Sequence, residues 1–356
     1  MSMPKRLSAV VIGSALLVVS GAGLASADPK GPYTTASPQY RQLAGVGSDT
    51  TQDVMNGLAD SAIVDGVKVL ASYNAIGSAT IATNASAGCA SVARPNGSGA
   101  GRTALLNSLN AGDGCVQFAR SSSLDTSASS QSLTYIPFAT DAVSYAVTTS
   151  SGVSRTLNMA DLQKLYTCDV GYVGTSAVPA SDAANTFEVT PVLPQAGSGT
   201  RKYWMGKMGI SEAQITAGTY PCIINGTKNG QAIEEHTGTV VDDKSLVPFS
   251  IAQYNSQATL VIADKRGRTV LGSIGTGTAG GSLTGVTYPS LLNGGFNVKR
   301  PVYNIVPTSK LGQAPYSQVF VGGTSLVCAD TATIQKFGFI PSADCGSTSA
   351  QSASTS

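Results

Sequence analysis

The chain has 356 residues, of which 42% are hydrophobic and only 12% are charged. This share of hydrophobic residues is enough for a core and excludes charge-driven disorder for most of the chain. Lysine and arginine total 22 against 20 aspartates and glutamates, a balance that argues against a nucleic-acid-binding protein.

The first 27 residues have the pattern of a secretory signal peptide. Lys5 and Arg6 form a basic start, an apolar run extends from Ala9 to Val19, and small residues before Asp28 fit cleavage after Ala27. The run is shorter than the roughly 20 apolar residues that a membrane anchor needs. Because the segment carries both of these basic residues and no acid, the mature chain is formally neutral. We expect it to be secreted, with no membrane insertion.

Export favours disulfide bonds, and the chain has six cysteines. Sequence spacing leaves their connectivity open, but we expect them to pair in sequential order. The expected pairs are Cys89–Cys115, Cys168–Cys222 and Cys328–Cys345. No cysteine lies in a CxxC pair and His236 is the single histidine, which argues against a metal site.

Short β-rich runs alternate with helical patterns after this point. Strands are expected at Arg41–Val46, Val67–Ser72, Cys115–Arg120, Tyr135–Phe138, Ala142–Val147 and Phe187–Leu193. Helices are expected to begin near Ser48, Arg102, Asn158, Thr200 and Ser250. This alternation predicts an α/β protein with largely parallel sheets.

Four segments place glycine and hydroxyl residues between an expected strand and an expected helix. They are Gly45–Thr50, Asn96–Arg102, Phe118–Ser123 and Ala196–Arg201. The start of a helix presents free backbone N–H groups and a partial positive charge, and hydroxyls add neutral donors. One such segment would be an ordinary helix cap. Four together predict an oxyanion-binding cradle that needs no large net charge.

With these loops the chain resembles the phosphate-binding, type II periplasmic substrate-binding proteins of ABC transporters. The resemblance spans roughly Gln39 to Pro341 and rests on Gly45-Val46-Gly47, Gly97-Ser98-Gly99 and Gly197-Ser198-Gly199-Thr200, which occur in the family's order. It implies a two-lobed fold with a hinge of two crossings, and an inter-lobe cleft that takes a small tetrahedral oxyanion, phosphate first among the candidates. It also implies delivery of that solute to an ABC permease.

The expected organisation follows from this reading. It is a signal peptide over 1–27, a flexible arm over 28–38, lobe 1 over 39–140 and again over 251–345, lobe 2 over 141–250, and a disordered tail over 346–356. We expect a monomer with no cofactor, no metal and no nucleic-acid partner.

The resemblance also implies which residues contact the ligand, with two departures from the family. Ser122 stands where the family has an aspartate that accepts the phosphate proton, and Pro194 stands where the family has an arginine. We hypothesise that Arg120 or Arg201 replaces the missing charge and that Asp49 replaces the acceptor. The expected ligand-binding residues are Ser48, Asp49, Thr50, Ser98, Arg120, Ser121, Ser122, Ser198, Gly199, Thr200 and Arg201.

The same departures favour an alternative. It is a secreted interaction or adhesion protein on a binding-protein fold that has lost phosphate binding.

An enzyme is not expected. The sequence has no GxSxG nucleophile elbow. The polar stretch 232–239, which contains Glu234, Glu235 and His236, is expected to be an exposed turn. The GxGxxG match at 275–280 is not followed by a helical pattern, so a dinucleotide cofactor is not expected either. Asp141, near the first expected crossing, is assigned to the core or to the cleft.

Overall fold

The computed structural model describes residues 28–29, 40–173, 176–179, 189–275, 282–283, 286–287, 291–292, 296 and 298–354. The expected signal peptide, most of the expected arm and the GxGxxG match beyond Gly275 lie outside these residues. Within the described part of the chain, no helix is long and apolar enough to cross a membrane.

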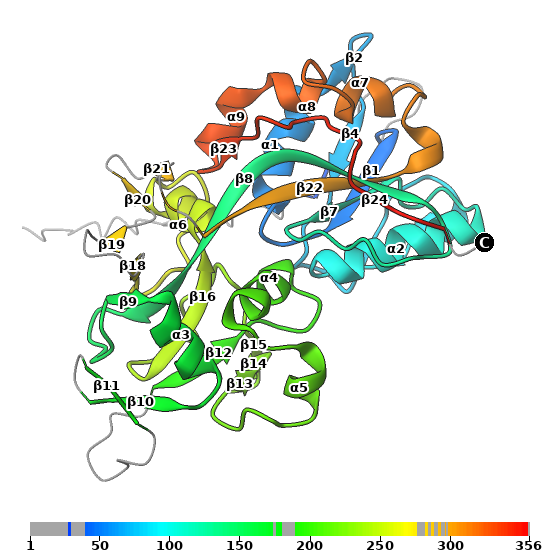
Figure 1. The fold of residues 1–356 in the computed structure, drawn as a ribbon. Helices are drawn as coiled ribbons and strands as arrows, with labels where there is room; N and C mark the ends of the chain where they lie inside the picture. Colours follow the sequence, from blue (N-terminus) through cyan, green and yellow to red (C-terminus); the bar gives the residue numbers. More distant parts are fainter. Residues whose placement is uncertain are drawn as a thin grey trace, which may run out of the picture.

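One long strand, β8 (Leu133–Thr148), runs through two α/β bodies (Figure 1). Its first half pairs with β22 (Lys299–Pro307), and its second half pairs with β16 (Ser245–Ser250) and β17 (Thr269–Leu271). We call the body around the first half of β8 lobe 1 and the body around the second half lobe 2. The sequence predicts two separate strands here, but the structure has one continuous strand that belongs to both lobes.

Lobe 1 is built on β1 (Leu43–Gly47), which pairs in parallel with β4 (Leu70–Ser72) and β7 (Phe118–Ser121). Successive residues of a strand point to opposite faces of a sheet. Accordingly, the β1 and β7 side chains fall alternately into two core clusters. One cluster contains α1 (Gln52–Ser61) and the other contains α2 (Ser98–Ala111), so the two helices cover opposite faces.

Three short helices complete lobe 1 on the α1 side. They are α7 (Tyr316–Phe320), α8 (Leu326–Ala329) and α9 (Thr331–Lys336).

Lobe 2 contains a second parallel group of strands. In it β12 (Thr190–Leu193) pairs with β13 (Ile224–Asn225) and with β16. The lobe's helices are α3 (Met159–Tyr166), α4 (Gly199–Met208) and α5 (Glu212–Thr216).

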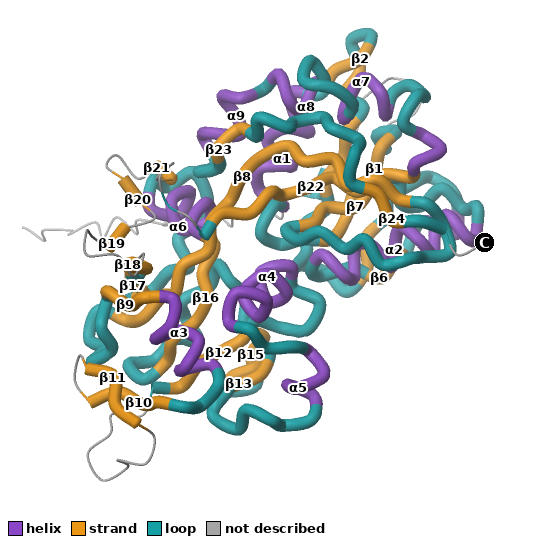
Figure 2. The backbone as a smooth tube through the Cα atoms, in the orientation of Figure 1, coloured by secondary structure: helices purple, strands orange, loops and turns teal. Residues whose placement is uncertain are grey.

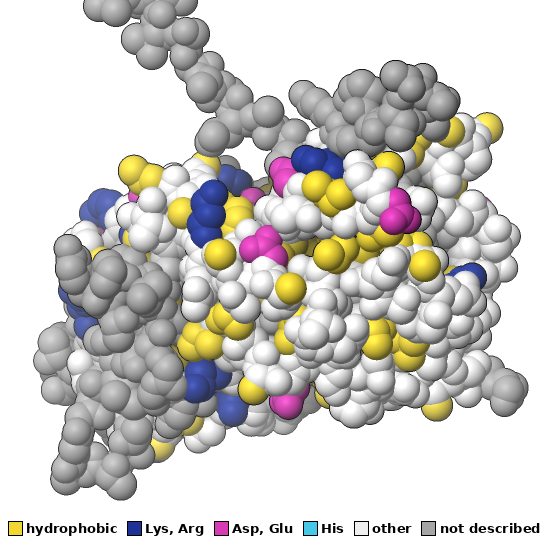
Figure 3. All heavy atoms as spheres, turned by 90° about the horizontal axis from the view of Figure 1, so that it is seen from above, with side chains coloured by type: hydrophobic (Ala, Val, Ile, Leu, Met, Phe, Trp, Pro, Cys, Tyr) yellow, Lys and Arg dark blue, Asp and Glu magenta, His cyan; other side chains and the backbone are white. Residues whose placement is uncertain are grey.

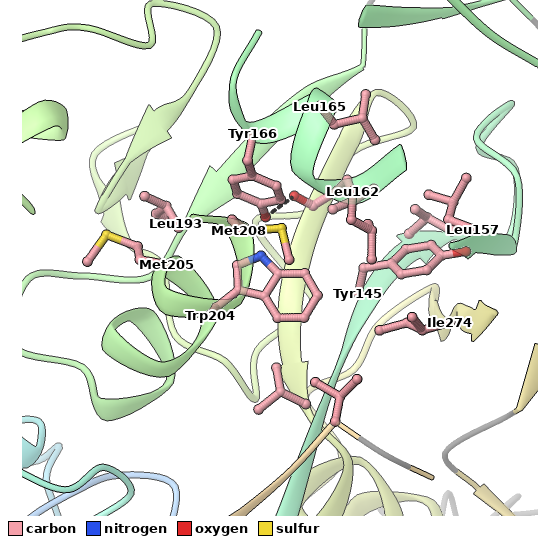
Figure 4. Packing of buried hydrophobic residues seen from close by; sticks show 14 of the residues in the cluster. Tyr145, Leu157, Leu162, Leu165, Tyr166, Leu193, Trp204, Met205, Met208 and Ile274 are labelled. Carbon is pink, nitrogen blue, oxygen red and sulfur yellow. Dashed lines mark hydrogen bonds between the residues drawn. The ribbon is translucent and has the colours of Figure 1, made fainter. Parts of the chain in front are cut away.

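The core of lobe 2 surrounds Trp204, which is fully buried. Its ring lies 6.0 Å from the Tyr166 ring in an edge-on arrangement, and Met208 points toward the same centre (Figure 4). Trp204 thus packs α4 against the rest of lobe 2.

The chain after β16 contributes to both lobes. Helix α6 (Ile251–Ala258) begins where β16 ends. Further along the chain, β17 pairs with the second half of β8, and β18 (Ser273–Gly275) pairs with β9 (Thr156–Asn158). This part of the expected lobe 1 return at 251–345 therefore lies in lobe 2.

The remaining short strands are β2 (Ile63–Val64), β3 (Val67–Lys68), β5 (Thr80–Ile81), β6 (Val92–Ala93), β10 (Val170–Val173), β11 (Ser176–Pro179), β14 (Thr227–Lys228), β15 (Gln231–Ala232), β19 (Ser282–Leu283), β20 (Val286–Thr287), β21 (Leu291–Leu292) and β23 (Ile340–Pro341).

The C-terminal segment differs from the expected disordered tail. Residues 346–354 lie along lobe 1, and β24 (Gln351–Ser352) pairs with the start of β8. The Tyr135 backbone N–H donates to the carbonyl of Ala350 at 2.8 Å. Backbone hydrogen bonds to the edge of β8 thus order a segment whose side chains alone gave no sign of structure.

The expected disulfide pairing is confirmed. The bonds join Cys89 to Cys115, Cys168 to Cys222 and Cys328 to Cys345. Loops connect many of the described elements (Figure 2). Charged side chains are sparse and scattered on the face seen in Figure 3, in keeping with the composition.

Candidate functional site

Four segments from the two lobes bring their hydroxyl groups together. The Thr50 Oγ1 atom, in the loop between β1 and α1, lies 3.3 Å from Ser122 Oγ and 3.4 Å from Thr200 Oγ1 at the start of α4. Ser98 Oγ, at the start of α2, lies 3.4 Å from Ser122 Oγ. We call these four hydroxyls, together with that of Ser198, the hydroxyl cradle.

Glycines allow the loops of the cradle to approach one another. Gly47 has a φ of +118°, and a side chain there would place its Cβ 2.8 Å from the Arg120 carbonyl oxygen. A Cβ on Gly199 would lie 2.3 Å from Ser122 Oγ and 2.5 Å from Ser98 Oγ. Both distances are far below contact distance. Glycine is therefore required where β1 ends and where α4 begins against lobe 1.

The cradle holds a carboxylate that belongs to the protein. The Oε1 atom of Glu235 accepts hydrogen bonds from the hydroxyls of Thr50 and, at 2.8 Å, of Thr200. Its Oε2 atom accepts from the hydroxyl of Ser198 at 3.1 Å. Ser198 is also the N-cap of α4 and accepts from the Arg201 N–H. Hydroxyls of both lobes therefore donate to one oxyanion.

A buried arginine lies behind the cradle. Arg300, at the start of β22, donates from Nη2 to Thr200 Oγ1 at 2.6 Å and to Asp141 Oδ2 at 2.9 Å. Asp141 in turn accepts from the Ser250 hydroxyl and the Ala252 N–H. The hydroxyl of Thr200 thus accepts from a guanidinium and donates to Glu235, so the positive charge of Arg300 acts on the cradle through one hydroxyl.

Acidic groups gather on the other side of Glu235. His236 Nε2 lies 3.4 Å from Glu234 Oε2, and its Nδ1 lies 3.8 Å from Asp49 Oδ2. Burial raises the pKa of Asp49 well above its usual value, and the charges of Glu235 and Glu234 add to the rise. Burial would also raise the pKa of Glu235, but His236, the Thr50 hydroxyl and Arg300 lower it below its usual value. The negative charge is therefore concentrated on Glu235 rather than on Asp49.

The stretch around His236 is not the exposed turn that the sequence predicts. Glu234, Glu235 and His236 are 8%, 0% and 4% exposed. They follow Ile233, whose backbone carbonyl accepts from the Gln195 N–H and so fixes the stretch against the loop before α4. Adjacent polar residues commonly indicate a solvated surface, and no motif in this sequence marks these residues or Arg300 as part of a site.

Arg120 does not contribute its charge to the cradle. Its guanidinium is fully buried and donates to the carbonyls of Ser48, Gly45 and Gly47 and to the Ser72 hydroxyl. These bonds fix the end of β1 and the loop that follows it. The sequence suggested that Arg120 supplies the charge of the family's missing arginine. Its contacts instead indicate a structural role within lobe 1.

Arg201 is engaged in the same way within lobe 2. Its Nε and Nη2 atoms donate to Glu212 at 2.9 and 2.6 Å, and its Nη1 atom donates to Asn225 Oδ1 and to the carbonyl of Pro194. Pro194, which stands where an arginine was expected from the resemblance, thus accepts a hydrogen bond from Arg201 through its backbone carbonyl. Asp49 does lie near the cradle, beside Glu235.

The segment Phe118–Ser123 also differs from its prediction, because no helix follows it before β8 in the described chain. Three helix starts therefore contribute to the cradle region instead of four. Ser122 still faces the cradle, and its N–H donates to Ser98 Oγ at 3.0 Å. The Ser121 hydroxyl donates to the carbonyl of Ser123.

A cavity of about 550 Å³ leads from the cradle to the space between α2 and α4. Ser98 and Ser198 of the cradle lie in its wall, together with Arg102, Tyr135, Lys202 and Met205. Residues of both lobes line it, and it borders the cradle at Ser98 and Ser198.

Comparison with known proteins agrees with this arrangement. The sequence profile of the PBP superfamily domain matches residues 33–321. No match was found among curated proteins.

Three solved structures show how distant the similar chains are. An ABC-type phosphate transport receptor from Vibrio cholerae is 17% identical, covers 84% of this chain and 99% of its own, and gives a TM-score of 0.48. A proposed phosphate ABC transporter substrate-binding protein from Clostridium perfringens, with bound phosphate, is 14% identical with the same two coverages and TM-score. A high-affinity periplasmic phosphate-binding protein bound with phosphate is 13% identical, covers 84% of this chain and 90% of its own, and also gives 0.48. At such low identities, the ligand of one chain cannot be assigned to another.

Proposed function

The chain belongs to the PBP superfamily, and we propose that it is a secreted solute-binding protein that captures a small tetrahedral oxyanion, phosphate first among the candidates, for an ABC-type uptake system. One observation carries the proposal. Hydroxyls from two lobes donate to both oxygens of the buried Glu235 carboxylate. A carboxylate is itself an oxyanion, so the cradle already has the donor geometry that a solute oxyanion needs.

The proposed capture relies on neutral donors and on one cation. Thr50, Ser198 and Thr200 supply hydroxyls, and the N-terminus of α4 supplies a partial positive charge next to them. Arg300 strengthens the Thr200 hydroxyl as a donor because it binds the same oxygen. A solute between the lobes would favour the closed arrangement of the two.

The signal-peptide pattern before Asp28 supports secretion, and the family supports a permease as the partner that receives the solute. We further propose that the protein is not an enzyme. Glu235 and Arg300 are fixed by hydrogen bonds and carry no pattern of a nucleophile with its base.

A second candidate remains, the interaction protein that has lost solute capture. It is favoured by the same carboxylate, because Glu235 fills the cradle, and by the engagement of Arg120 and Arg201 in contacts elsewhere.

Melting temperature separates the two candidates. A solute that binds only the folded state at 100 times its Kd stabilises it by about 2.7 kcal/mol. We therefore expect phosphate, or sulfate, to raise the melting temperature by several degrees over sodium chloride of equal ionic strength. Equal melting temperatures in all three salts would favour the interaction protein.

A further inference from the structure

We propose that Glu235 is a resident occupant of the hydroxyl cradle, that the solute must displace it, and that it joins the lobes while no solute is bound. The displacement part rests on the proposed function, whereas the joining part does not. The proposal concerns the regulation of the site by a side chain of the chain itself.

The first argument is that the carboxylate uses the donors that a solute would use. Thr50 and Thr200 donate to Oε1 and Ser198 donates to Oε2, so each oxygen has at least one hydroxyl partner. Glu235 is 0% exposed. A solute oxyanion cannot form these bonds while Glu235 keeps them, because each hydroxyl has a single proton to donate.

The second argument is electrostatic. Asp49 and Glu234 lie close enough to Glu235 that its charge raises the pKa of Asp49. An anion bound beside an undisplaced Glu235 would join this group of acids, with Arg300 already paired to Asp141. Like charges in a buried site repel strongly. Exchange of one oxyanion for another is therefore favoured over binding of both.

The third argument concerns the lobes. Glu235 belongs to lobe 2, and Thr50 belongs to the loop after β1 in lobe 1. Other polar contacts also join the lobes at the cradle. Arg300 of β22 donates to Thr200 at 2.6 Å, and Asn96 donates to Glu234 at 3.5 Å. The Gly99 N–H donates to the Gly197 carbonyl at 3.1 Å, and Lys202 lies 3.4 Å from Asp125 in an exposed pair. An exposed ion pair contributes little. The Thr50–Glu235 bond is thus one of the buried polar links between the lobes, and it is the one that a solute would break.

The test compares the full secreted chain with three variants. Glu235→Ala removes the occupant, Glu235→Gln keeps its size without its charge, and Glu212→Gln changes a lobe 2 glutamate that binds Arg201 outside the cradle. Phosphate affinity is measured by calorimetry for all four proteins. The radius of gyration without phosphate is measured by small-angle X-ray scattering. Far-UV circular dichroism shows which variants are folded. If only one of the two Glu235 variants folds, its phosphate affinity alone is enough to test the displacement.

We expect both Glu235 variants to bind phosphate at least tenfold more tightly than the wild-type protein and Glu212→Gln to match it. We also expect Glu235→Ala to have a larger radius of gyration without phosphate and to become compact when phosphate is added. Equal phosphate affinity in all four proteins would overturn the displacement and leave the proposed function intact. Binding by none of them would overturn the proposed function and the displacement. Scattering then decides the joining of the lobes on its own, because an unchanged radius in Glu235→Ala would overturn it.

Discussion

The guanidinium of Arg300 lies 2.9 Å from the carboxylate of Asp141 where β22 runs beside β8, and both side chains are buried. The two residues are register partners in the antiparallel pairing of these strands. Because the same guanidinium binds Thr200, the pair connects the junction of the lobes to the hydroxyl cradle.

Replacement of Arg300 is therefore expected to destabilise the whole fold. Arg300→Met leaves Asp141 buried without its cation, and removal of one partner of a buried pair costs about 3–5 kcal/mol. Urea denaturation measures the loss. Arg268→Met, which removes one partner of an exposed pair with Asp243, is the matched control and is expected to show no measurable change. Equal losses for the two variants would refute the role of the buried pair.

Removal of one cradle hydroxyl is expected to weaken anion binding. Thr200→Val deletes a donor to the bound oxyanion, and a hydrogen bond to a charged group is worth about 1.5–3 kcal/mol. Phosphate affinity should thus fall by about 10–100-fold, measured by titration calorimetry. Thr190→Val, in β12 of the same lobe, is expected to keep wild-type affinity. Because Thr200 also donates to the resident Glu235, the comparison is made in the Glu235→Ala background, where unchanged affinity on Thr200→Val would place the site elsewhere.

The raised pKa of Asp49 predicts a pH dependence of stability. A carboxyl whose pKa is higher in the folded state binds more protons there, so the free energy of unfolding falls as pH rises through that pKa. This contribution to the free energy of unfolding is complete below the ordinary pKa of an aspartate. It is lost as pH rises from there through the raised pKa of the folded state. Asp49→Asn keeps an acceptor for the Thr50 N–H and removes the ionisation.

We therefore expect the melting temperature of Asp49→Asn to fall less than that of the wild-type protein between pH 5 and pH 7.5. These two pH values lie about one and several units above an ordinary aspartate pKa. The exposed Asp65→Asn is the control and should follow the wild-type curve. A wild-type slope in Asp49→Asn would show that Asp49 does not titrate in this range.

The disulfides are expected to differ in their contribution to stability. Loop-closure entropy in the unfolded chain grows with the number of residues enclosed. Cys168–Cys222 spans 54 residues and Cys328–Cys345 spans 17. Paired alanine substitutions should cost about 4 kcal/mol for the first and about 3 kcal/mol for the second. Urea denaturation without reductant measures both, and the reverse order would contradict the entropic account.

Local sequence signals predicted the parts of the fold that are fixed by neighbours in the chain. Asn158 and Ser250 cap the helices that were expected to begin at them, because a cap depends on residues three positions away. The oxidised pairs were also predictable, since export and sequential order left one simple choice. Gly199 was expected at the site, and the structure shows why no larger residue fits there.

The acidic side of the site could not be predicted in this way. Glu235 reaches Thr50 across 185 positions of the chain, and Arg300 reaches Thr200 across 100. Only the packing of the two lobes brings these residues together, and neither Glu235 nor Arg300 lies in a motif. The same reason explains Arg120 and Arg201. Their position next to glycine and serine suggested ligand contact, but nearby carbonyls and Glu212 bind them instead.

Titration calorimetry of the wild-type protein with phosphate, and in parallel with sulfate, tests the central claim most directly. Capture of a small oxyanion at the hydroxyl cradle predicts saturable heat with one equivalent of at least one of these anions. It also predicts that Thr200→Val weakens that binding in the Glu235→Ala background, where no resident carboxylate shares the Thr200 hydroxyl. Absence of heat with both anions, in a protein that circular dichroism shows to be folded, would contradict the claim.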